Sequence, residues 1–160
     1  TLCNPLSSYA RNKTMCRSTY AAEIHSALDL LGLGMLIQGT VTEMLTGTLS
    51  ANQLLDVHNG AGHAIPLHLF IDARSVFDSV TAKNVKTPAD KILLLHALAL
   101  REHLDRRQLA RISWIDTRDM VADALNKGSI DRTALRAFFE DSVWHLLHDV
   151  KTWQFGDRVV

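Results

Sequence analysis

Two short apolar segments constrain the fold of this chain most, because helical sequence lies on both sides of each. Residues 67–71 are mostly apolar and end at Asp72, and residues 111–115 form a second segment of the same length. Apolar runs this short favour strands, whereas the residues around them place apolar side chains at helical spacing. Alternating strands and helices predict an α/β fold with a mixed sheet flanked by helices.

The sequence around these strands predicts several helices. Ser18 can cap a long, mostly apolar helix, which glycines at its far end weaken without clearly stopping it. Residues 5–17 indicate extended chain, and residues 46–65 indicate an irregular connection around a short turn. The remaining helices are predicted, in chain order, at 73–80, 87–104, 119–127 and from Asp131 to Leu147.

Composition places the chain among single globular domains. Its 160 residues are 47% hydrophobic and 21% charged, and 17 Lys and Arg balance 17 Asp and Glu, so the net charge argues neither for nor against a nucleic-acid partner. Cys3 and Cys16 are the only cysteines, and neither a signal pattern nor an apolar run of about 18 residues occurs. We therefore expect an intracellular protein, cytoplasmic or nuclear, that is neither secreted nor bound to a membrane.

Three acidic residues stand on three different kinds of segment. Glu23 lies near the start of the long helix, Asp72 ends a strand, and Asp123 lies on a later short helix. Carboxylates gathered from rigid elements are how nucleases bind magnesium. Taken singly, each has a plainer explanation, as a helix-dipole acid, a helix cap or a surface charge, and Asp119 is an equal candidate to Asp123.

Three segments resemble the ribonuclease H domains of copia-type retrotransposons. Residues 17–25, Arg-Ser-Thr-Tyr-Ala-Ala-Glu-Ile-His, are similar to the family's Ser-Thr-x-Glu-Ala-Glu segment. Residues 70–75, Phe-Ile-Asp-Ala-Arg-Ser, are similar to its Asp-bearing strand. Residues 114–128, from Trp114 to Gly128, are similar to its closing stretch, and the resemblance covers roughly residues 5–135.

The resemblance implies a ribonuclease H-like fold for residues 1–135, apparently without its first strands, followed by a C-terminal helix and tail at 136–160. It implies hydrolysis of the RNA strand of RNA–DNA hybrids by a retroelement Pol polyprotein, whose reverse-transcriptase domain lies upstream. Carried over to this sequence, the ligands of a two-ion Mg²⁺ site are Glu23, Asp72 and Asp123. Several basic residues lie near these acids in the sequence. Of these we expect Arg74 and Lys127 to contact nucleic-acid phosphates, and the plainer explanation of each is a solvated surface charge.

Some residues depart from the family pattern. The family has a fourth acid on an earlier strand, but none of the 22 residues before Glu23 is Asp or Glu. We therefore expect an N-terminally incomplete domain that is inactive by itself. Ala21 stands where the family usually has Glu, and Asp116 where it usually has Pro.

Two alternatives remain open. The chain is either a catalytically inactive, repurposed or relic ribonuclease H-like domain that binds nucleic acid or protein, or an unrelated α/β domain whose acids are caps and surface charges. Histidines recur at 58, 63 and 68 and at 145 and 148, but no further ligand completes a zinc site convincingly.

Overall fold

The computed structural model describes residues 18–84, 91–126, 128, 132–154 and 156–157. The predicted extended segment at 5–17, the helix starts at Thr87 and Asp131, and Lys127 lie outside the described residues. The elements, in chain order, are α1 (Thr19–Thr46), α2 (Ala51–His58), β1 (His68–Ile71), α3 (Arg74–Thr81), α4 (Lys91–Asp105), β2 (Arg111–Ile115), the 3-10 helix η1 (Thr117–Asp119), α5 (Val121–Asn126), α6 (Thr133–Asp141) and β3 (Val150–Gln154).

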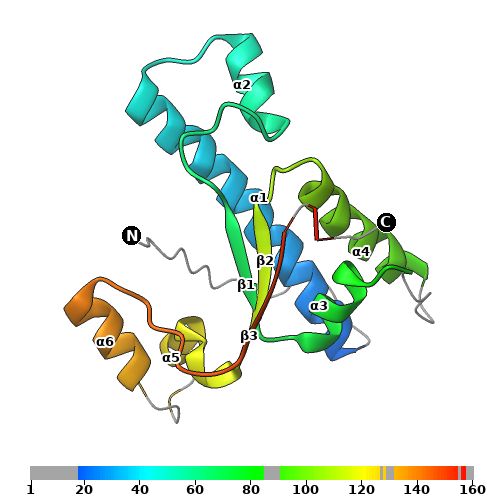
Figure 1. Cartoon of the computed structure of the whole chain (residues 1–160), viewed down its shortest axis with the longest axis vertical. Coiled ribbons are helices and arrows are strands. Elements are labelled where there is room, and N and C mark those ends of the chain that lie inside the picture. Colours follow the sequence, from blue (N-terminus) through cyan, green and yellow to red (C-terminus); the bar gives the residue numbers. More distant parts are fainter. Residues whose placement is uncertain (1–17, 85–90, 127, 129–131, 155, 158–160) are drawn as a thin grey trace.

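A three-stranded mixed sheet in the order β1-β2-β3 organises the described part of the chain (Figure 1). β1 pairs with β2 in parallel, with Ile71 opposite Trp114, and the crossover between them contains α3 and α4. β3 pairs with β2 antiparallel, with Val150 opposite Ile115. The prediction of a mixed α/β fold with helices around a sheet is therefore confirmed.

Helix α1 begins where the sequence predicts, because Ser18 Oγ accepts a hydrogen bond of 3.2 Å from the backbone N–H of Ala21. Its buried residues recur every three to four positions, so one face of the helix packs inward. The helix continues through its glycines to Thr46. At Gly34 an added Cβ would lie 2.9 Å from Leu67 Cδ1, so this glycine lets the Leu67 side chain approach α1 closely.

By length and composition alone, α1 would be able to cross a membrane. A core helix meets the same criteria, and α1 contributes Ala21, Ile24, Ala27 and Leu31 to the core. The apolar character of α1 therefore gives no information about where the protein resides.

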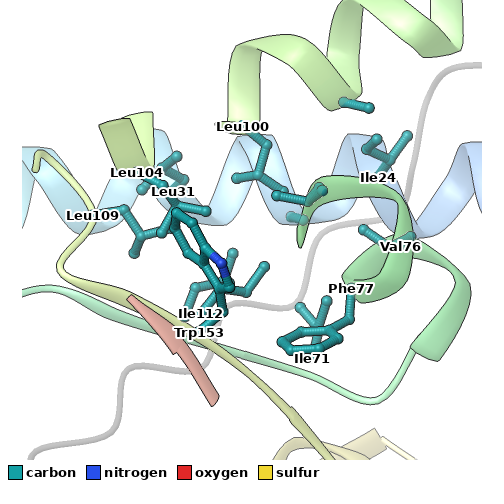
Figure 2. Packing of buried hydrophobic residues seen from close by; sticks show 14 of the residues in the cluster. Ile24, Leu31, Ile71, Val76, Phe77, Leu100, Leu104, Leu109, Ile112 and Trp153 are labelled. Atoms are coloured by element: carbon teal, nitrogen blue, oxygen red, sulfur yellow. The ribbon is translucent and has the colours of Figure 1, made fainter. Parts of the chain in front are cut away.

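Helices α1, α3 and α4 cover one face of the sheet, and the core lies between them (Figure 2). Ile24 of α1, Val76 of α3, Leu100 of α4 and Ile112 of β2 are all completely buried. Each such side chain contributes about 1.5–3 kcal/mol relative to exposure. This core fixes the position of α3, which directly follows Asp72.

The connection at 46–65 is more ordered than the sequence predicts. It contains α2, which starts with a capping box in which Ser50 and Gln53 exchange side-chain to backbone hydrogen bonds. Farther along, Gln38 Nε2 donates to the Ile65 carbonyl at 2.7 Å, and the Ala64 N–H donates to the buried Thr42 hydroxyl at 3.1 Å. Polar side chains on α1 thus hold the end of the connection that enters β1.

The C-terminal segment differs from the predicted helix and tail at 136–160. Helix α6 ends at Asp141, followed by Ser142 at φ 54°, and the helix does not reach Leu147. A left-handed residue ends a right-handed helix, so the chain turns back and forms β3. Trp153 of β3 is 8% exposed and belongs to the core, so this segment completes the sheet.

We predict that Gly60→Ala lowers the free energy of unfolding by about 2–4 kcal/mol, measured by urea denaturation. Gly60 has φ 85°, and a Cβ there would overlap the carbonyl oxygen of Arg106, which belongs to backbone and has no alternative rotamer. The matched control is Gly62→Ala, where φ is 70° but a Cβ meets nothing within 4 Å. That variant should lose only about 1 kcal/mol, and equal losses would show that the contact with Arg106 is unimportant.

Candidate functional site

The carboxyl ends of β1 and β2 meet at one edge of the sheet, because the two strands are parallel. Asp72 follows β1 at this edge and is half-buried. Its backbone carbonyl accepts a hydrogen bond of 2.9 Å from Trp114 Nε1, and its Oδ2 accepts a long one of 3.4 Å from Thr117 Oγ1. Asp72 is therefore held beside the segment that leaves β2.

The segment after β2 leads directly to Asp123. It forms η1 and then α5, and Asp123 lies in the first turn of α5 with its N–H donating to the Met120 carbonyl at 3.1 Å. The side chain of Asp123 is half-buried. Asp72 thus lies beside the segment that leads along the chain to Asp123.

Glu23 lies one turn into α1 and is half-buried. One turn earlier, the Tyr20 hydroxyl is 2.8 Å from Ser79 Oγ of α3. This contact connects the beginning of α1 to the helix that follows Asp72. The contact thus places the beginning of α1 against α3, whereas Asp123 lies on α5.

Among the described residues, no group of three or more His, Cys, Asp or Glu side chains is arranged so that it could hold a metal ion. The chemistry of the donors suits Mg²⁺, since carboxylate oxygens are the ligands it prefers. The assignment of Glu23, Asp72 and Asp123 as ligands stays a prediction from the sequence.

Asp116, which stands where the copia-type family usually has Pro, forms an ion pair with Arg118. The Arg118 guanidinium donates to both carboxylate oxygens, at 2.8 and 2.9 Å, and the Arg118 N–H adds a third bond of 2.9 Å. These hydrogen bonds hold the pKa of Asp116 well below its ordinary value, and the same pairing raises the pKa of Arg118. The pair orders the turn between β2 and η1.

Asp119 has a structural role that the sequence did not reveal. Its side chain is 1% exposed, Oδ2 accepts from the N–H groups of Leu147 and His148 at 3.1 and 2.8 Å, and Oδ1 lies 2.9 Å from His148 Nδ1. Its carbonyl also accepts from Trp144 Nε1 at 3.0 Å. Both carboxylate oxygens are therefore used to hold the segment that precedes β3.

This arrangement separates the two acids that the sequence left as equal candidates. Asp119 binds residues 147–148, whereas Asp123 lies farther along on α5 and is half-buried. A carboxylate whose oxygens already accept three hydrogen bonds is a poor metal ligand, because those bonds would have to break. Asp123 is the better candidate of the two.

Of the two residues predicted to contact nucleic acid, only Arg74 lies within the described part of the chain. Arg74 is exposed at the start of α3, 3.6 Å from Asp78, and its guanidinium lies 5.1 Å from the centre of the Trp114 ring. It lies two residues after Asp72 in the chain, and its contact with a phosphate stays a prediction. Lys127 lies outside the described residues.

Comparison with known proteins identifies no relative, since no family model, curated protein or solved structure matches the chain. The functional interpretation accordingly depends on the residues of the chain and their arrangement.

We predict that Asp119→Asn lowers the free energy of unfolding by about 2–4 kcal/mol, because it removes a buried charge and leaves its donors poorly paired. Urea denaturation measures this loss. The control Asp78→Asn breaks an exposed ion pair and should change stability by less than about 0.5 kcal/mol. Similar losses in both variants would contradict the structural role of Asp119.

The same carboxylate makes stability depend on pH. Burial raises the pKa of Asp119, but hydrogen bonds from His148 and the Leu147 N–H outweigh this and leave the pKa below its ordinary value. A lowered pKa stabilises the fold above the unfolded-state value of about 3.9, and this contribution disappears as pH falls through the folded-state pKa. The stability difference between the wild type and Asp119→Asn should therefore shrink between about pH 5 and about pH 2 in urea titrations. A constant difference would contradict this linkage.

Proposed function

We propose that this chain is the ribonuclease H portion of an intracellular retroelement Pol polyprotein, and that the complete protein hydrolyses the RNA strand of RNA–DNA hybrids with Mg²⁺. The observation that carries the proposal is the position of Asp72 at the shared carboxyl edge of β1 and β2, next to the segment that leads to Asp123. The order of the three acids along the chain, together with the resemblance of the segments around them, supports it.

The reaction assigns distinct tasks to the residues. Magnesium, when bound, supplies charge stabilisation at the phosphate and a more acidic water as nucleophile. Asp72 and Asp123 would hold it from the edge of the sheet, and Glu23 from α1. Arg74 would contact a phosphate beside Asp72, since its guanidinium is exposed there. Sequence-independent contacts of this kind suit a hybrid, whose shallow groove displays 2′-hydroxyls.

The second candidate is a ribonuclease H-like domain that binds nucleic acid without cleaving it. It is favoured by the arrangement of the described acids, in which no group of three is positioned to hold a metal ion. A hybrid-cleavage assay separates the two, provided that it uses a longer protein carrying an upstream reverse-transcriptase domain and the strand with the fourth acid. Binding without cleavage by that protein supports the second candidate.

We predict that Mn²⁺, which prefers the same oxygen ligands as Mg²⁺, binds this chain at the three acids. In NMR spectra, paramagnetic broadening should centre on the amide signals of Glu23, Asp72 and Asp123. Asp72→Asn and Asp123→Asn should each weaken Mn²⁺ binding by about tenfold or more, because each removes a charged ligand.

The control for this titration is Asp56→Asn, which removes an exposed acid on α2, at the opposite end of the molecule from α5 in Figure 1. It should leave Mn²⁺ binding unchanged. Broadening that is absent at millimolar Mn²⁺, or that centres away from these acids, would contradict the proposed metal site.

A further inference from the structure

A pocket of about 500 Å³ lies between α3 and β3, and none of the three predicted metal ligands lines it. Phe77 and Trp153 line it, and both belong to the buried core, so this part of its wall is rigid (Figure 2). Lys83, just beyond α3, and Lys151 of β3 also line it. The volume is within the range of about 300–1,000 Å³ typical of ligand sites.

The charge of the pocket favours an anion. Both lysines are exposed, and within the described part of the chain neither one forms a salt bridge. Asp157 also lines the pocket, but its carboxylate accepts a hydrogen bond of 2.9 Å from the Gln154 N–H. Two ammonium groups that line one pocket from separate parts of the chain are suited to a phosphate, for which lysine acts as a point charge.

Hydrogen bonds from a side chain of α4 hold the short segment after α3 that carries Lys83. Arg101 of α4 donates to the Ala82 carbonyl at 2.8 Å and to the Lys83 carbonyl at 3.5 Å. On the other side, Lys151 belongs to β3, which pairs with β2 along its whole length. Both lysines therefore extend from fixed backbone, which reduces the entropy lost when a ligand binds.

The pocket is also related geometrically to the acidic edge. Lys151 of β3 pairs with Trp114 of β2. Trp114 Nε1 in turn donates a hydrogen bond to the carbonyl of Asp72, the residue that follows β1. Neighbouring strands are about 4.8 Å apart, so Lys151 is about 10 Å from β1 across the sheet.

We propose that this pocket binds a phosphate group, and that in the nucleic-acid complex it takes a backbone phosphate other than the one at Asp72. The identity of the ligand rests on the proposed function, whereas the preference for phosphate rests on the pocket itself. Lys83 and Lys151 hold the phosphate.

The test is binding of a fluorescently labelled RNA–DNA hybrid to the full 160-residue chain, followed by anisotropy over a series of salt concentrations. The double variant Lys83→Gln/Lys151→Gln should bind about tenfold more weakly, and its plot of log affinity against log salt should be shallower by about one to two. The matched control is Lys91→Gln, which changes an exposed lysine at the start of α4 that does not line the pocket. Circular dichroism confirms that all variants fold.

The outcomes separate the two proposals. If the wild type binds hybrid and the double variant behaves like Lys91→Gln, the pocket proposal is overturned and the proposed function stands. If the wild type does not bind hybrid, the assignment of the ligand as a nucleic-acid phosphate is overturned, and NMR titration with inorganic phosphate decides about the pocket. Shifts of the Trp153 and Thr152 signals that disappear in the double variant support a phosphate site, and their absence overturns it.

Discussion

The parallel pairing of β1 with β2 is the constraint on which the candidate site depends. Parallel neighbours require a crossover, and here α3 and α4 supply it while they cover one face of the sheet. The same pairing sends both strands toward one edge. Asp72 and the segment from Asp116 to Asp123 consequently share that edge, although about forty residues of crossover separate the two strands. An antiparallel pairing would have placed them at opposite edges.

The second constraint is the buried carboxylate of Asp119, which links this edge to the C-terminal strand. By accepting hydrogen bonds from the backbone at 147 and 148, it directs the chain into β3, and β3 then contributes Trp153 to the core. Phe70 and Trp144 make a T-shaped ring contact at 4.7 Å that supports the same segment. An acid that resembles a catalytic candidate in the sequence thus stabilises the fold around the candidate site.

Local sequence signals were sufficient for some elements and not for others. The segments predicted at 67–71 and 73–80 appear as β1 and α3, shifted by one residue, because their periodicity and flanking residues agree. The helix predicted through Leu147 ends earlier, at Asp141. Beyond it, the backbone N–H of Leu147 donates a hydrogen bond to the distant Asp119 and not to a residue of the same helix. β3 was missed because only Trp153 in it is buried, so its strand character comes from pairing with β2. Nothing in the local sequence indicates that residues 147 and 148 bind Asp119 and not Asp123.

A balanced net charge is compatible with a nucleic-acid partner when the charges are separated in space. Here Asp72 and Asp116 follow the two parallel strands at the carboxyl edge of the sheet, and Lys83 and Lys151 line the pocket between α3 and β3. Carboxylates repel a phosphate backbone, so an acidic edge engages it only with a cation between them, whereas the lysines attract it directly. The pocket would therefore hold the strand while the acids, with metal, act on it. Such a division of tasks is what the proposed function requires of a chain with 17 positive and 17 negative side chains.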